Sequence, residues 1–169
     1  MNIRVPGTSL NRSAARENSD HMRFCIQVVK QASVDIDGVR TASIGQGMLV
    51  LLGVGKEDDE AVADKMIAKL LKMRIFSDSE GKTNLSLADI DGEMLLVSQF
   101  TLYADCKHGN RPSFTDSMGP QRAEELYNYV ADKIRPQVKK LELGVFGADM
   151  QVSLINDGPF TVILDSAAI

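Results

Sequence analysis

The stretch "RFCIQVVKQASVDIDGVRTASIGQGMLVLLGVG", residues 23–55, decides the fold class. Apolar and polar residues alternate on both sides of Asp37-Gly38, a pair whose residues tolerate the positive φ of a tight turn. This pattern predicts a β-hairpin. The apolar run "GMLVLLGVG" that follows has the length of one strand and does not alternate, which is typical of a central strand buried on both faces.

Two later segments have a helical period. In "DDEAVADKMIAKLLKMRIF", residues 58–76, apolar side chains recur every three to four residues, and the acidic start suits the helix dipole. A second helix is predicted over Gln121–Ile134, because Pro120 fits a first helical turn and Pro136 ends the pattern.

Strand-like segments account for the rest of the chain: "EMLLVSQFTLYA" (93–104), "LGVFGADMQVSLIN" (143–156) and "FTVILD" (160–165). The predicted order is four strands, a helix, a strand, a helix and further strands. We therefore expect one mixed α/β domain over residues 22–165, with a largely antiparallel, curved, barrel-like sheet and two packed helices. Residues 166–169 are expected to be a short tail.

The first 21 residues differ from the rest in being polar and without an apolar period, so they are predicted to be a disordered extension. Their arginines, with no acid before Glu17, also fit an organelle transit peptide. An upstream start or a cloning remnant is the favoured interpretation, because Met22 opens the strand pattern.

The composition excludes several classes of protein. A net charge of −4 gives no global signature of a nucleic-acid binder, so any RNA contact must use a local patch. No apolar run approaches the roughly 20 residues of a membrane span. Cys25 and Cys106 have no Cys or His companions at zinc-ligand spacing, so we expect no metal and no cofactor, and unpaired thiols in a reducing, cytoplasmic compartment.

Few residues remain for chemistry. The sequence has no HExxH, P-loop or GxGxxG motif, and His108, in a polar loop, is the only histidine besides His21. "SQFT", Ser98–Thr101, follows a buried run, so its polar groups emerge where a strand leaves the core. They either satisfy backbone groups at a strand end or line a site. Lys107 and Arg111 in the next loop belong either to a solvated turn or to an anion-binding edge.

With these segments in view, the chain resembles the D-aminoacyl-tRNA deacylase family over nearly all of residues 22–165. The resemblance rests on "SQFTLYAD" (98–105), "RPSF" (111–114), "GVFGADMQVSL" (144–154) and "NDGPFT" (156–161). The co-occurrence of SQxT and NxGPxT in this order is specific, whereas either motif alone is weak.

The resemblance implies a homodimer that hydrolyses the ester of D-aminoacyl-tRNA, and of glycyl-tRNA, in a pocket at the subunit interface. It assigns Ser98, Gln99, Phe100 and Thr101 to the catalytic pocket. A cis Gly158-Pro159 pair from the other subunit is implied to select the D-configuration through its backbone. Phe114 and Met150 complete the implied substrate-binding set, and Lys107 and Arg111 are candidates for tRNA contacts, with Lys139 and Lys140 as a weaker pair.

Two points stay open at this stage. Thr101 is a conceivable nucleophile with no visible base, so water positioned by the ribose 2′-OH, with backbone N–H groups near Phe100 and Thr101 as an oxyanion hole, is the preferred hypothesis. The chain also departs from the family at Val28, where many relatives have Arg, and at Phe160, where Val is commoner. The alternatives are a relaxed editor of small L-aminoacyl groups with a trans Gly-Pro bond, and a non-catalytic nucleic-acid- or protein-binding module on the same fold.

Overall fold

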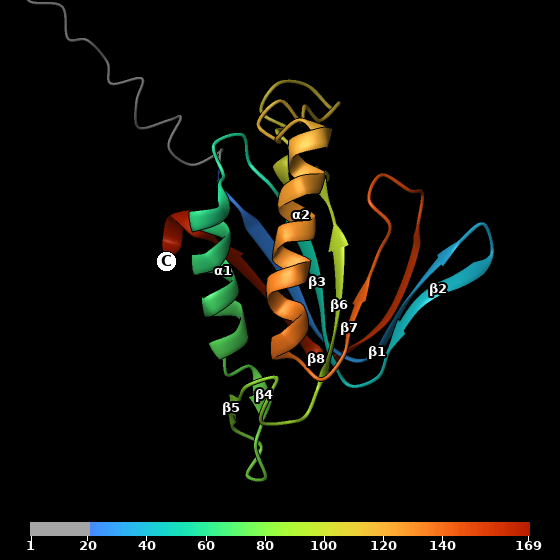
Figure 1. Ribbon diagram of the computed structural model, residues 1–169, viewed down its shortest axis with the longest axis vertical. Helices are drawn as coiled ribbons and strands as arrows, with labels where there is room; N and C mark the ends of the chain where they lie inside the picture. The colour runs from blue at the N-terminus through green and yellow to red at the C-terminus, as the bar shows by residue number, and fades with distance from the viewer. Residues whose placement is uncertain (1–20) are drawn as a thin grey trace, which may run out of the picture.

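β1 (Arg23–Ile36) is the strand around which the sheet is built in the computed structural model, which describes residues 21–169. Its first half pairs with β3 (Gly47–Gly53) and its second half with β2 (Val39–Ile44), both antiparallel. The predicted hairpin is confirmed, since Asp37 and Gly38 have φ of 50° and 78°. On its other edge β1 pairs along its length with β8 (Gln151–Asp165), as Figure 1 shows.

Helical crossovers add two parallel strands. α1 (Glu60–Lys72), followed by the small hairpin β4 (Phe76–Ser77) and β5 (Thr83–Leu85), leads from β3 to β6 (Glu93–Ser98). The 3₁₀ turn η1 (Phe100–Tyr103), α2 (Pro120–Ile134) and the turn η2 (Arg135–Gln137) lead to β7 (Leu141–Leu143). The resulting order, β2-β1-β3-β6-β7 with β8 beside β1, confirms the mixed α/β fold.

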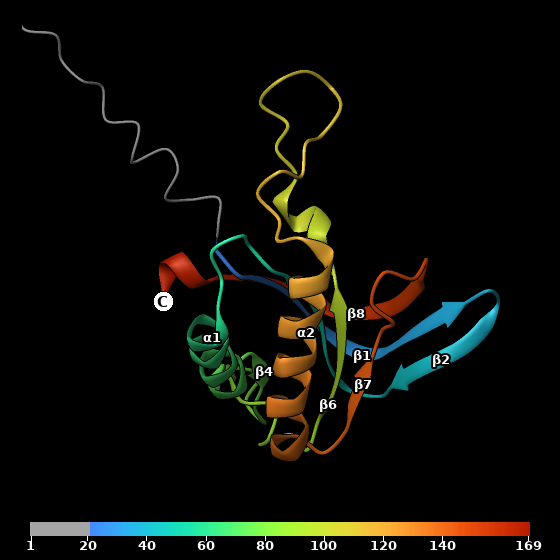
Figure 2. The same cartoon turned by 45° about the horizontal axis from the view of Figure 1, so that its top comes forward.

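Both helices cover one face of the sheet (Figures 1 and 2). α1 begins where the carboxylate of Asp59 accepts from the N–H of Val62 at 2.9 Å, and α2 begins at Pro120. Their apolar stripes pack on β1, β3 and β6 in the main core. A second cluster lies between the curled ends of β1, β2, β3 and β6, which gives the sheet its barrel-like form.

Four expectations need correction or comment. Three strands, not four, precede α1, because residues 23–36 form one long strand. Residues 144–150 form turns rather than a strand, since Gly144 and Gly147 interrupt the ladder. The tail forms the turn η3 (Ser166–Ala168), and the N–H of Ser166 donates to the carbonyl of Met22 at 3.0 Å. The predicted disordered extension falls, apart from His21, on residues outside the described range.

None of the helices in residues 21–169 has both the length and the hydropathy that crossing a bilayer requires.

Candidate active site

A pocket of about 680 Å³ opens at the carboxyl end of β6. Ser98, Gln99 and Phe100 form one side, where the chain leaves the sheet and enters η1. Phe114 and Met150 line it from the segment before α2 and from the turn before β8. Five of the residues predicted from the sequence for the site therefore share one cavity, although they lie up to 52 positions apart in the chain (98 to 150).

The SQFT segment is held by its backbone rather than by its side chains. The N–H of Gln99 donates to the carbonyl of Leu52 at 2.7 Å, which ties the strand end to β3. η1 then begins with the bond from the N–H of Leu102 to the carbonyl of Gln99, so the N–H groups of Phe100 and Thr101 are not used inside the turn. The side chain of Thr101 does not line the pocket; its hydroxyl accepts from the amide of Gln99.

Aromatic and sulfur-containing side chains shape the apolar part of the pocket. Phe100 is 57% exposed and meets Phe114 edge to face, with ring centroids 5.2 Å apart. Tyr127 of α2 supports the opposite wall, because its hydroxyl donates toward the carbonyls of Leu96 (2.8 Å) and Gly144 (3.3 Å). Burial raises the pKa of Tyr127, so its hydroxyl keeps the proton that it donates.

Of the residues that the structure describes, Asp149 is the one with an ionisable side chain that lines this pocket. Its carboxylate is exposed at the rim, next to Met150. Sequence reasoning missed it, because it lies in a segment that was read as a strand. Within residues 21–169 no histidine, lysine or arginine lines the cavity, so these residues form no Ser-His-Asp arrangement there.

The Gly-Pro pair lies in a detour of β8. Gln27 and Val29 of β1 pair with Thr161 and Asn156 of β8, respectively. One residue lies between the two on β1, whereas four residues, 157–160, lie between their partners on β8. The four extra residues leave the ladder as a loop that carries Gly158 and Pro159, both exposed. Their peptide bond is cis, as the resemblance implies. Neither residue lines the pocket of its own chain.

Asn156 and Gln27 close the base of this loop. The Asn156 side chain accepts from the N–H of Phe160 at 2.5 Å and donates to the Phe160 carbonyl at 3.1 Å. It also donates to the amide oxygen of Gln27, which accepts from the Thr161 hydroxyl as well. Sequence reasoning missed both amides, although a polar Asn before Gly-Pro was visible.

Comparison with known proteins supports the resemblance on which these residues were chosen. The family model described as D-Tyr-tRNA(Tyr) deacylase matches residues 25–165. The chain belongs to this family. It is 53% identical over 146 residues to the D-aminoacyl-tRNA deacylase of Thermosipho melanesiensis, a match that covers 86% of this chain and 97% of that one.

Two solved structures are similar to this member of the deacylase family. One is described as "c-Myc DNA Unwinding Element Binding Protein", with 39% identity, a TM-score of 0.80, and coverage of 84% of this chain and 97% of that one. The other is described as "a probable eukaryotic D-amino acid tRNA deacylase", with 19% identity, a TM-score of 0.74, and coverage of 86% and 99%. The second likeness concerns the fold alone.

Val28 and Phe160, the two positions where the chain was expected to depart from the family, both lie beside the loop. Val28 lies on β1 opposite the detour and is 7% exposed in the main core. Phe160 is half-buried and packs against the same core, so its larger ring rests on the sheet beside Val162.

Lys107 and Arg111 lie apart from the pocket lining in this deacylase. Their loop is closed by paired main-chain bonds between Asp105 and Ser113, at 2.7 and 2.9 Å, and it projects beyond the first turn of α2 in Figure 2. Both side chains are exposed, and neither forms an ion pair with a residue of the described chain.

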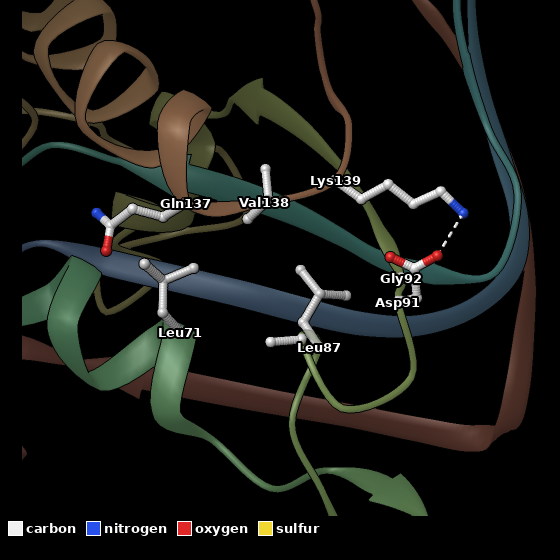
Figure 3. Close-up of a pocket in the computed structure, with 8 residues that line it drawn as sticks. Leu71, Leu87, Asp91, Gly92, Gln137, Val138 and Lys139 are labelled. Atoms are coloured by element: carbon white, nitrogen blue, oxygen red, sulfur yellow. Dashed lines mark ion pairs between the residues drawn. The ribbon is translucent and has the colours of Figure 1, made fainter.

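A smaller cavity, of about 180 Å³, lies at the C-terminal end of α1 and is shown in Figure 3. Leu71, Leu87 and Val138 line it, and the ion pair of Lys139 with Asp91 (2.9 Å) spans one side. Lys140 in turn donates to the carbonyl of Ser43 at 2.7 Å. Both lysines of the weaker predicted pair are therefore engaged within the chain, which favours a structural role for them.

Proposed function

We propose that this protein hydrolyses D-aminoacyl-tRNA to free tRNA and the D-amino acid, as a cytoplasmic enzyme of translation quality control. The observation that carries the proposal is the pocket that Ser98, Gln99, Phe100, Phe114 and Met150 share in a member of the D-Tyr-tRNA(Tyr) deacylase family. Such a cavity, largely apolar with main-chain polar groups at one side, suits an aminoacyl-adenosine.

In the proposed reaction a water oxygen bonds to the ester carbonyl carbon and the bond to the ribose 3′-oxygen breaks. The departing 3′-oxygen takes one proton of this water, and the other is released to solvent as the D-amino acid leaves as its carboxylate. The N–H group of Phe100, which lines the pocket and is not used within η1, is the suggested donor for the oxyanion, with the next N–H, that of Thr101, as a second candidate. The adjacent 2′-OH of the substrate positions the water, which fits a pocket that none of the described histidines lines.

The proposed active unit is a homodimer in which the 157–160 loop of one subunit enters the pocket of the other. Among the described strands β8 pairs only with β1, so its outer edge is open, and it exposes Leu154, Ile155 and Ile163. A long open edge with apolar side chains is a surface that proteins normally cover. The exposed Gly158 and Pro159 would then supply a rigid backbone wall that rejects an L side chain.

Sedimentation tests the dimer together with activity. Ile163 is 60% exposed, and Ile163→Lys should yield a monomer that does not hydrolyse D-aminoacyl-tRNA. The matched control is Val39→Lys, since Val39 is 65% exposed but lies on β2, away from β8. A fully active monomer would contradict the shared site.

A deacylation assay tests the substrate. Purified protein should hydrolyse D-tyrosyl-tRNA and glycyl-tRNA and leave L-tyrosyl-tRNA intact. Thr101→Ala and Asp149→Asn should each retain kcat within about tenfold if the 2′-OH and the backbone do the chemistry. If Thr101→Ala abolishes hydrolysis without affecting binding, a side-chain nucleophile replaces this scheme; if Asp149→Asn does so, the carboxylate is the base.

The relative described as a DNA unwinding element binding protein favours one alternative, a nucleic-acid-binding role on the same fold. Binding of a DNA duplex, with no turnover of any aminoacyl-tRNA, would support it. Hydrolysis of small L-aminoacyl-tRNA at a rate comparable to that of the D-form would instead identify a relaxed editor.

A further inference from the structure

Asp58 is the one carboxylate that is buried among residues 21–169, with 5% of its surface exposed. One oxygen accepts from the N–H of Gly55 at 2.6 Å and the other from the N–H of Met22 at 2.9 Å. Its neighbour Asp59 caps α1, so helix capping does not account for Asp58. Burying a charged carboxylate costs free energy unless hydrogen bonds compensate for the lost water. The segments that donate those hydrogen bonds therefore indicate what Asp58 stabilises.

The segment that Asp58 holds is joined to the wall of the substrate pocket. Gly55 forms a β-bridge with Ser117, the N–H of Lys56 donates to the carbonyl of Asp116 at 3.3 Å, and the N–H of Met118 donates to the carbonyl of Val54 at 2.9 Å. Val54, Ser117 and Met118 all line the pocket, as does Phe114 of the same turn. These few bonds attach the 113–118 turn to the end of β3.

We propose that Asp58 is a positioning residue for the deacylation pocket: its ionised carboxylate fixes Val54–Lys56, and through them the 113–118 wall, in the conformation that binds substrate. The proposal rests on the proposed function only in naming the substrate. It assigns to Asp58 a role in substrate affinity rather than in the chemical step, since its carboxylate does not line the pocket.

Protonation acts on this attachment in two opposed ways, because it removes an acceptor but makes the group less costly to bury. Burial raises the pKa of Asp58 to about 6, despite the two backbone hydrogen bonds, which lower it. The charged groups that face it are His21, which lowers the pKa, and Asp165, which raises it and is itself paired with Arg23 at 2.9 Å. Its chain neighbours Lys56, Glu57 and Asp59 are exposed. A protonated oxygen is a donor, so one of the two N–H groups loses its acceptor.

Steady-state kinetics on D-tyrosyl-tRNA at pH 7.5, where the carboxylate is ionised, test the role. Asp58→Asn should raise KM by roughly tenfold, the loss expected for one hydrogen bond to a charged group, with kcat little changed. Asp59→Asn, the matched neighbour, should keep the wild-type KM. An unchanged KM in Asp58→Asn would overturn the proposal.

Amide NMR of the wild-type protein provides a second test. It needs no variant that might fail to fold, and it does not depend on catalytic activity. The N–H signals of Gly55 and Met118 should titrate together with a midpoint near 6, because both report on the segment that the carboxylate holds. If they titrate but no aminoacyl-tRNA is hydrolysed at any pH, the proposed function fails and the attachment stands. If they do not titrate, the attachment itself is wrong.

Discussion

The side chain of Asn156 hydrogen bonds to both the N–H and the carbonyl of Phe160, four residues ahead in the same strand. It thereby replaces the cross-strand partners that the detour at residues 157–160 removes from Phe160. The exposed Gly158-Pro159 pair thus lies in a loop whose two ends are hydrogen-bonded to each other through the side-chain amide of Asn156.

Asn156→Ala should therefore loosen the loop while leaving most of the sheet intact. We expect a loss of about 1–3 kcal/mol in stability, because the partly buried polar groups of Phe160 and Gln27 lose a partner, and at least a tenfold fall in the ratio of kcat/KM for D- over L-tyrosyl-tRNA. Ser153→Ala on the same strand is the control. Unaltered selectivity in Asn156→Ala would separate the loop from chiral selection.

Gly158→Ala should damage the loop more severely. Gly158 has φ of +151°, and an added Cβ would lie 2.8 Å from the backbone nitrogen of Phe160. Backbone has to move to relieve this contact, so we expect activity to fall by two or more orders of magnitude, about 3 kcal/mol in the transition state. Gly81→Ala shares a positive φ (+77°) but meets no atom within 4 Å, and it should remain active.

Replacing Lys107 and Arg111 by Gln should weaken tRNA binding without altering the pocket. Each lost phosphate contact lowers the slope of log K against log salt by about 0.7–0.9, so the double variant should lose roughly 1.5. Filter binding at several salt concentrations measures this slope. Lys65 and Lys69, exposed on α1, provide a control pair of equal charge; an equal effect of that pair would place the RNA elsewhere.

Tyr127→Phe should lower stability by about 1 kcal/mol, because the tyrosine hydroxyl no longer donates to the carbonyls of Leu96 and Gly144. The Leu96 carbonyl still accepts from the N–H of Gly144. Tyr129→Phe, on the same helix, breaks an exposed bond to Asp64 and should change stability by less than about 0.5 kcal/mol. Urea denaturation of both variants gives the comparison, and equal losses would contradict it.

Asp58 should give stability a distinct pH dependence. Its folded pKa of about 6 lies above its unfolded value of 3.8, so between pH 4 and 6 the folded state binds more protons than the unfolded state. This group therefore makes the free energy of unfolding fall as pH rises through that window, by up to roughly 3 kcal/mol. Urea denaturation at pH 4.5, 5.5 and 7 should show a contribution of this sign that Asp58→Asn lacks.

The sequence predicted the features that depend on local pattern. The Asp37-Gly38 turn and both helices were confirmed because turn chemistry and a 3.6-residue period act within a few residues. The pocket residues of the SQFT segment came from motif resemblance, and the structure brings Ser98–Phe100 together with Phe114 and Met150.

Contacts between distant segments explain what was missed. Gln27 and Asn156 are 129 positions apart, so nothing local indicates that their amides meet. The detour could not be predicted for the same reason. Residues 157–160 could either end one strand before a second one or loop out of a single strand, and the pairing of β1 with β8 on both sides of them decides for the second. Asp149 was assigned to a strand because its segment is apolar, although two glycines end the ladder there.

The detour in β8 also has a consequence for how this fold can vary. Because the strand resumes its pairing at Thr161 opposite Gln27, the length and composition of the excursion are uncoupled from the register of the sheet. Changes at residues 157–159 can therefore be accommodated without shifting the strand pairing on either side of them. Phe160, by contrast, packs against the core and is held by Asn156, so it belongs to the scaffold.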